Sequence, residues 1–142
     1  MIKEGQYIAG NCGAVAITAL VIMLLLSISG AAMATVCQTE LAMAREFSDG
    51  LAAHYLAEAG AVRAVSELST NHGWPGINSW VYFDATQPEN GQYKIKVESI
   101  SGQPTRRKVT AYGKFNAAER QIVVWVTLAA DAPPVVDLWR NF

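Results

Sequence analysis

The sequence predicts an α+β protein in which a long N-terminal helix packs on a small antiparallel sheet of three to four strands. An uncharged apolar stretch fills residues 14–36, and helical periodicity continues from there to about residue 69. Apolar and polar residues alternate from about Tyr93 onward, which is typical of strands. We therefore expect a leader peptide at residues 1–13, an apolar helix half at 14–36, an amphipathic helix half at 37–70, and a β domain with an extended C-terminal tail at 71–142.

The apolar stretch from Ala14 to Val36 is long enough to cross a membrane. No charged residue occurs between Glu4 and Glu40, and about 20 apolar residues, rising about 1.5 Å each, span a bilayer core. Its polar side chains are hydroxyls that can bond to their own helix, those of Thr18, Ser27, Ser29 and Thr35. We predict a membrane-spanning helix with the leader in the cytoplasm and the C-terminal part outside.

Three interpretations of this N-terminus stay open. It is a permanent signal-anchor, or a secretory signal peptide cleaved after the small-x-small triplet Ala32-Met33-Ala34. In the third interpretation a peptidase cuts after Gly13, the mature chain starts at Ala14, and the whole apolar helix is kept. Gly10 is a second candidate for that cut.

The amphipathic helix half shows apolar residues at steps of three, four and seven. They are Leu41, Ala44, Phe47, Leu51, Tyr55, Val62, Val65 and Leu68. We predict that this apolar stripe packs on the β domain. The first proline is Pro75, and the segment from Thr70 to Gly76 predicts the end of the helix.

The C-terminal half predicts an antiparallel meander. In its first strand three apolar residues share one face, and Lys94, Lys96 and Glu98 share the other. The further strands are Lys108 to Phe115, Gln121 to Leu128, and a short one at Trp80 to Phe83. The strand from Gln121 is apolar on nearly both faces, so we expect the helix to cover one face and a neighbouring subunit the other. The tail is predicted to be extended and to dock through Trp139.

Composition argues against several classes of function. The 142 residues carry 11 Lys and Arg against 12 Asp and Glu, a net charge of −1, so we expect no nucleic acid partner. His54 and His72 are isolated, and the two cysteines form no CxxC pair. We find no catalytic constellation, no metal-ligand pattern and no cofactor motif, and we predict a protein that is not an enzyme.

Three segments together resemble the PilX-like minor pilins of type IV pili and the pseudopilins of type II secretion. The first is a short leader ending in Gly13 and followed by Ala14-Val15-Ala16-Ile17-Thr18-Ala19-Leu20. The second is Tyr55-Leu56-Ala57-Glu58-Ala59-Gly60, followed by Val62 to Leu68. The third is Val109 to Gly113, then Arg120 and the strand Ile122 to Val126, with Trp139-Arg140 near the end.

The resemblance implies a pilin-like fold and a structural role in starting or capping a type IV pilus-like filament. It implies processing by a prepilin peptidase between Gly13 and Ala14, with methylation of the new N-terminus. Thr18 then stands at mature position five, where major pilins have Glu, and this departure indicates a minor component. The implied partners are other minor and major pilins, an inner-membrane assembly platform and the lipid bilayer. The implied locations are the bacterial inner membrane and the extracellular pilus.

The resemblance also marks a helix-packing motif, comprising Ala57, Glu58, Ala59, Gly60 and Arg63. Its small residues would permit close approach of the sheet or of another helix. Glu58 with Arg63 is either a specific pair between subunits or an ordinary solvated helix face.

Two other functions stay open. One is an anchored or secreted binding or cell-adhesion module, favoured by the Ala32-Met33-Ala34 site and by the aromatic residues Trp74, Trp80, Tyr82 and Phe83. The other is the main building block of the filament, against which Thr18 argues.

Overall fold

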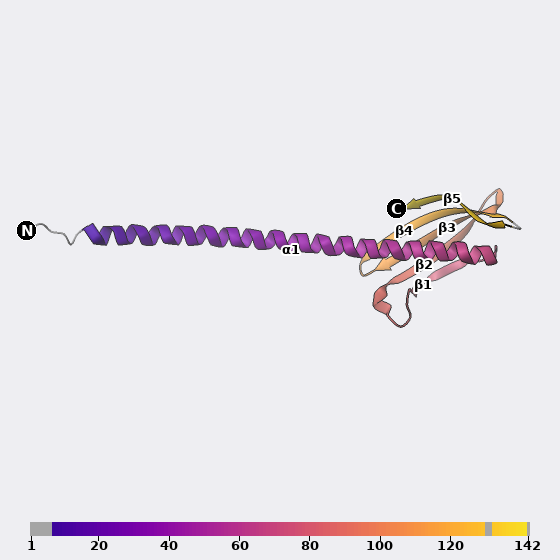
Figure 1. Cartoon of the computed structure of the whole chain (residues 1–142), viewed down its shortest axis with the longest axis horizontal. Helices are drawn as coiled ribbons and strands as arrows, with labels where there is room; N and C mark the ends of the chain where they lie inside the picture. The colour runs from indigo at the N-terminus through magenta and orange to yellow at the C-terminus, as the bar shows by residue number, and fades with distance from the viewer. Residues whose placement is uncertain (1–6, 130–131, 142) are drawn as a thin grey trace, which may run out of the picture. The chain divides into compact units, whose positions relative to one another are not determined.

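The computed structural model describes residues 7–129 and 132–141, and their side chains from residue 13 onward. The chain divides into two units, Met1–Ala44 and Arg45–Phe142, which are described separately. The predicted α+β class is confirmed, because a long N-terminal helix is followed by an antiparallel sheet (Figure 1). The helix, α1, runs from Tyr7 to Thr70 and so belongs to both units.

The first unit consists of the N-terminal part of α1. Its side chains are exposed from Gly13 to Ala44. The helix is long and apolar enough to cross a membrane, with a mean hydropathy of 2.4 in its most apolar window, none of it buried. The predicted leader falls partly outside the described residues; the remainder of it, from Tyr7 to Gly13, is helical.

The helix ends where the sequence predicts. The amide of Asn71 still bonds to the carbonyl of Glu67 at 2.8 Å, and the amide of Trp74 then bonds to the Asn71 carbonyl at 3.0 Å. The side chain of Asn71 accepts a bond from the amide of Gly73, also at 3.0 Å. This local turn redirects the chain into the first strand, and Pro75 prevents the helix from continuing.

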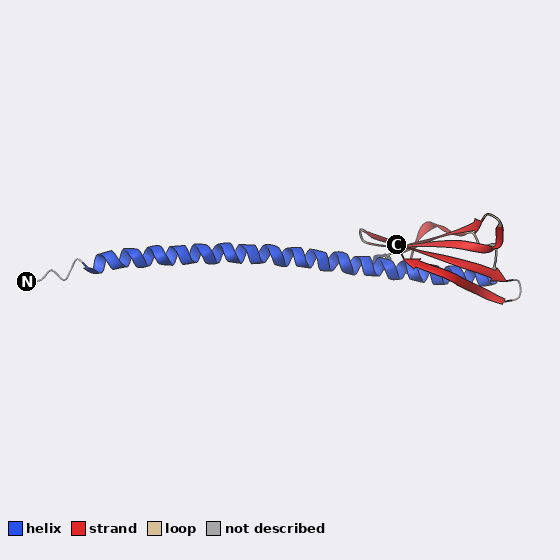
Figure 2. Ribbon diagram, turned by 90° about the horizontal axis from the view of Figure 1, so that it is seen from above, coloured by secondary structure: helices blue, strands red, loops and turns tan. Residues whose placement is uncertain are grey.

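The strands of the described part of the second unit lie together as one sheet (Figure 2). The sheet has five strands in the order β1-β2-β3-β4-β5, an antiparallel meander. The strands are β1 (Gly76–Tyr82), β2 (Gln92–Ile100), β3 (Gln103–Phe115), β4 (Ala118–Ala129) and β5 (Ala132–Asn141). A short 3-10 helix, η1 (Pro88–Asn90), lies between β1 and β2. The helix segment of this unit lies along one face of the sheet.

The prediction of three to four strands is therefore corrected to five. The fifth strand is the tail, which pairs with β4 from Ile122 to Ala129. The tail is predicted from sequence to be extended, and its two consecutive prolines, Pro133 and Pro134, have no amide hydrogen to donate to a ladder. They are tolerated because β5 is an edge strand and because the β4–β5 pairing shifts register between Thr127 and Ala129, where the two prolines lie.

The predicted apolar stripe of the helix is also corrected. Leu68 is buried and Val65 packs on the core, but Phe47, Leu51 and Tyr55 are exposed; the same holds for Leu41, Ala44 and Val62. The face that packs on the sheet consists mostly of small residues, namely Ala53, Leu56, Ala57, Gly60, Ala61, Ala64 and Leu68. A pattern based on bulky apolar residues does not mark this face, because most of its residues are alanine or glycine. Their small side chains let the helix backbone come close to the sheet.

The helix backbone comes close to the sheet at Gly113 in β3. A Cβ atom built on Gly113 would lie 2.0 Å from the carbonyl oxygen of Ala53 and 2.4 Å from the amide nitrogen of Ala57. Arg120, the cross-strand partner of Gly113, places its guanidinium beside Gly50 of the helix. Gly50 is itself buried, so glycines on both elements form the contact.

The helix covers one face of strand β4, as predicted, and side chains of the same sheet partly shield the other face. Ile122, Val124 and Val126 are fully buried in the core beneath the helix. On the opposite face Val123 is buried, and the guanidinium of Arg140 lies over the ring of Trp125 at 5.8 Å. The neighbouring subunit expected at this face stays a prediction.

Candidate subunit-contact surface

The helix of the first unit presents an apolar surface on every side. Its large side chains are about half to three quarters exposed, from Val21 at 50% to Met33 at 72%. The hydroxyls of this segment donate to their own backbone carbonyls, as predicted. Ser27 bonds to the Met23 carbonyl and Ser29 to that of Leu25, both at 2.8 Å. Few polar groups are therefore left to resist burial of this surface.

Thr18, which would be mature position five, behaves in the same way. Its hydroxyl lies 2.9 Å from the carbonyl oxygen of Val15 and 3.1 Å from that of Ala14. Gly13 and Ala14 lie within α1 and are exposed. A Cβ atom on Gly13 would have no neighbour within 4 Å, so a substitution there meets no steric conflict within the chain.

In the second unit, the helix carries bulky apolar residues on the side that the sheet leaves uncovered. Phe47 is 74% exposed and Tyr55 is 59% exposed, with Leu51 between them and Val62 beyond. Steps of four, four and seven place these residues on one side of a helix. We call these four residues the outer helix stripe. Exposed apolar residues grouped in this way mark an interaction site more often than scattered ones.

A groove of about 330 Å³ lies beside the outer helix stripe. It is lined by Ala52, Tyr55, Leu56, Ala59, Phe83, Asn90 and Phe115. Ala59, from the predicted packing motif, contributes to this groove, and Phe83 is more than half exposed at it. Sequence reasoning missed the groove because its residues come from the helix, the β1–β2 connection and the end of β3. The available signal was the pair of phenylalanines, Phe83 and Phe115, at the ends of two predicted strands.

The remaining members of the packing motif have distinct surroundings. Ala57 and Gly60 are buried against the sheet, where a Cβ on Gly60 would lie 3.4 Å from the Tyr93 ring. Arg63 lies over the Tyr93 ring, hydrogen-bonds to its hydroxyl and pairs with Glu67 at 3.7 Å. Glu58 is half-buried. Arg63 therefore has partners within its own chain.

The predicted aromatic cluster is divided between separate places. Trp74 packs against the core, whereas Trp80 lies next to Lys94 on the sheet face away from the helix. Tyr82 and Phe83 are exposed near the end of β1. These four residues do not form one binding site.

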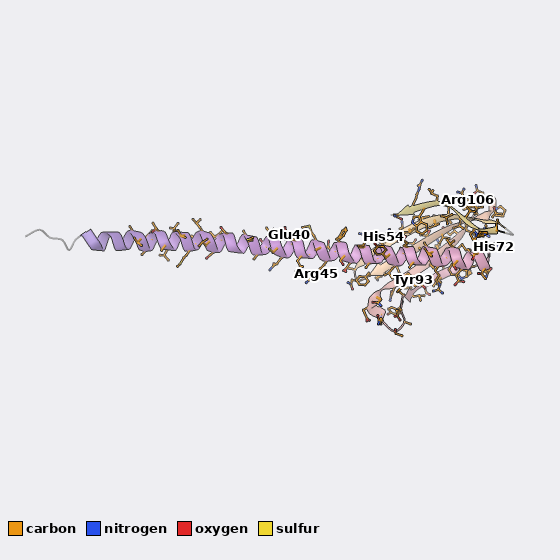
Figure 3. The ribbon with its side chains drawn as sticks, viewed as in Figure 1. Glu40, Arg45, His54, His72, Tyr93 and Arg106 are labelled. Atoms are coloured by element: carbon orange, nitrogen blue, oxygen red, sulfur yellow. The ribbon has the colours of Figure 1, made fainter. Side chains whose placement is uncertain are left out.

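Titratable side chains are dispersed. His54 and His72 lie at different points along the helix and its end (Figure 3), and within residues 7–129 and 132–141 no group of three or more His, Cys, Asp or Glu is placed to hold a metal. Hydrogen bonds from the hydroxyl and amide of Thr86 lower the pKa of Asp84 in an exposed turn. That arrangement stabilises the turn and provides no paired acid and base.

Comparisons with protein-family models, curated proteins and solved structures find no match to this chain.

Proposed function

We propose that this protein is a minor pilin or pseudopilin that helps to initiate or cap a type IV pilus-like filament. The observation that carries the proposal is the outer surface of α1. Apolar side chains are exposed on every side of its first part, and the outer helix stripe stays uncovered where the sheet packs on the opposite side. A lone soluble domain has no use for this surface, whereas a bundle of like helices would bury it.

The physical basis is the transfer of one apolar surface between two apolar environments. Before assembly the first part of the helix would reside in the inner membrane. During assembly it would leave lipid and pack among other pilin helices, so that its side chains stay out of water. The outer helix stripe would extend the same contact beyond the membrane, and the β domain would determine which subunits flank it.

The resemblance of the sequence supports processing between Gly13 and Ala14, and mass spectrometry of the mature N-terminus tests it. The protein is purified from membranes of cells with and without a prepilin peptidase. We expect a mature chain starting at Ala14, N-methylated, only where the peptidase is present. Gly13→Val should leave the chain uncut, while the matched variant Gly10→Val should be cut normally.

Two other results contradict the proposal. A mature chain that starts at Thr35 would mean a secreted domain and would favour the binding-module alternative. A chain that is cut after Gly13 but absent from sheared filaments, and whose deletion leaves their number unchanged, would exclude a role in assembly.

A further inference from the structure

The face of the sheet that is turned away from the helix gathers the cations of the β domain. Strand alternation and register place six of them there, Lys94, Lys96, Arg106, Lys108, Lys114 and Arg140. Among the described residues, the carboxylates on the same face are those of Glu98, Glu119 and Asp137. The helix segment from residue 40 to residue 70 carries the opposite excess, with five carboxylates and two arginines. The net charge of −1 therefore conceals two oppositely charged surfaces.

The cations on this face form a track along β2 and β3. Along β2 and β3 the register gives five consecutive rows with one cation each, those of Lys114, Lys94, Lys96, Lys108 and Arg106. Arg140 on β5 lies in the same row as Lys96. Alternate residues of a strand lie about 6.7 Å apart, so the track is about 27 Å long. Glu98 neutralises part of it through Lys96 at 2.6 Å and Lys108 at 3.8 Å, and Asp137 pairs with Arg106 at 3.0 Å.

Aromatic rings alternate with the cations on the same face. The Lys94 ammonium lies 4.8 Å from the centre of the Trp80 ring and 4.5 Å from that of Tyr112. Lys114 lies 5.9 Å from the Trp80 ring, and Trp125 lies under Arg140. Each of these contacts holds a cation beside a half-buried ring. A nucleotide presents the matching pair of groups, a phosphate next to a flat base.

We propose that this sheet face binds single-stranded nucleic acid, with phosphates on the cation track and bases on the rings of Trp80, Tyr112 and Trp125. A linear polyanion matches the regular spacing of the cations, and the rings favour a chain that also carries exposed bases over one that carries charge alone. The inference is independent of the filament role, because it concerns the opposite face from the one that packs on α1.

The test uses the full chain in micelles of an uncharged detergent and a fluorescein-labelled 20-nucleotide oligothymidylate, followed by fluorescence anisotropy. About three uncompensated cations predict a slope of about −2 for log affinity against log salt concentration. Affinity should therefore fall about 16-fold between 50 and 200 mM salt. Duplex DNA, polyglutamate and heparin compete as unlabelled polyanions and should compete more weakly than unlabelled oligothymidylate.

Matched variants separate the roles of the cations and the rings. Lys94→Gln should weaken binding about fivefold and make the salt slope less steep by about 0.7. Trp80→Leu should weaken binding to a similar degree with the slope unchanged, since stacking involves no counterion. Arg45→Gln removes the same charge from the helix and should leave the affinity within twofold. Circular dichroism checks that each variant is folded.

Absence of binding at 50 mM salt would overturn the proposal. So would equal competition by duplex DNA, polyglutamate or heparin, because the face would then recognise charge alone. An equal loss of affinity for Arg45→Gln and Lys94→Gln would place the binding elsewhere.

Discussion

At the scale of single residues, two glycines of the helix–sheet contact differ in the space they leave for a side chain. A Cβ on Gly113 would overlap the helix backbone at Ala53 and Ala57, which cannot move aside without separating the two elements. A Cβ on Gly60 would meet side chains of Tyr93, Ala111 and Ile95 at 3.4–3.5 Å, an ordinary packing distance. Only the first position requires glycine for space.

We therefore expect Gly113→Ala to destabilise the β domain and Gly60→Ala to leave it unchanged or stabilise it. Overpacking at Gly113 should cost about 3 kcal/mol. At Gly60 the gain in helix propensity is worth up to about 1 kcal/mol. Thermal unfolding in detergent, followed by tryptophan fluorescence, measures both. Equal losses of stability for the two variants would contradict the close backbone contact between helix and sheet at Gly113.

A second prediction concerns Glu98 on the outer sheet face. Its pKa is lowered, first by the hydrogen bond and charge of Lys96 and to a smaller extent by Lys108. Because the folded state favours the charged carboxylate, Lys96→Gln should raise the pKa of Glu98 back toward its ordinary value. Lys108→Gln should raise it less. NMR titration of the Glu98 carboxyl carbon measures both shifts, and the reverse order would contradict the geometry of this pair.

At the scale of elements, α1 has two apolar faces with different tasks. Neighbouring residues show the contrast most directly, since Leu56 is 7% exposed beneath the sheet and Tyr55 is exposed on the outer helix stripe. Burial of the first face against the sheet stabilises the domain. The second face contributes little to that stability and is available for a partner.

Alanine substitutions at these two positions should therefore separate folding from assembly. Leu56→Ala leaves a cavity and should cost about 2–5 kcal/mol of stability. Tyr55→Ala should change stability by no more than about 0.5 kcal/mol and should reduce recovery of the protein in sheared filaments. Chemical unfolding and immunoblots of the filament fraction measure the two effects. Normal filament recovery for both Tyr55→Ala and the double variant Phe47→Ser/Tyr55→Ser would argue against the stripe as a subunit contact.

The sequence was sufficient to predict the helix and four of the five strands, and less so which faces these elements bury. The helix end near Thr70 followed from local signals, and the alternation from Tyr93 to Glu98 placed Ile95 in the core. The packed face of the helix was missed because alanine and glycine carry little hydrophobic signal, although they decide how closely two backbones approach. The tail was predicted to be extended, but its pairing with β4 was missed, because local signals do not show a register that places Pro133 and Pro134 at an irregularity of the ladder. The groove at Phe83 depends on contacts between distant segments.

At the scale of the whole molecule, the distribution of apolar and charged groups gives one short chain three kinds of surface. An uncharged helix surface suits lipid or a helix bundle. The small-residue face of the same helix holds the β domain. The cationic sheet face, opposite that contact, remains accessible to a ligand. Average composition hides this separation, because the acidic helix segment and the basic sheet face cancel in the net charge.

This organisation predicts a single-pass protein whose β domain lies outside the cytoplasm. In a background without the native cysteines, Ser99→Cys introduces an exposed thiol on β2, and Ile95→Cys introduces a buried one on the same strand. A membrane-impermeant maleimide should label Cys at position 99 in intact spheroplasts and should label position 95 only after denaturation. The labelled protein should stay in the membrane pellet after a carbonate wash, because the apolar helix is retained.

Labelling only after lysis would place the domain in the cytoplasm. Labelled protein in the soluble fraction would mean that the apolar helix had been removed, and the filament mechanism would then have no helix to transfer from lipid to the bundle.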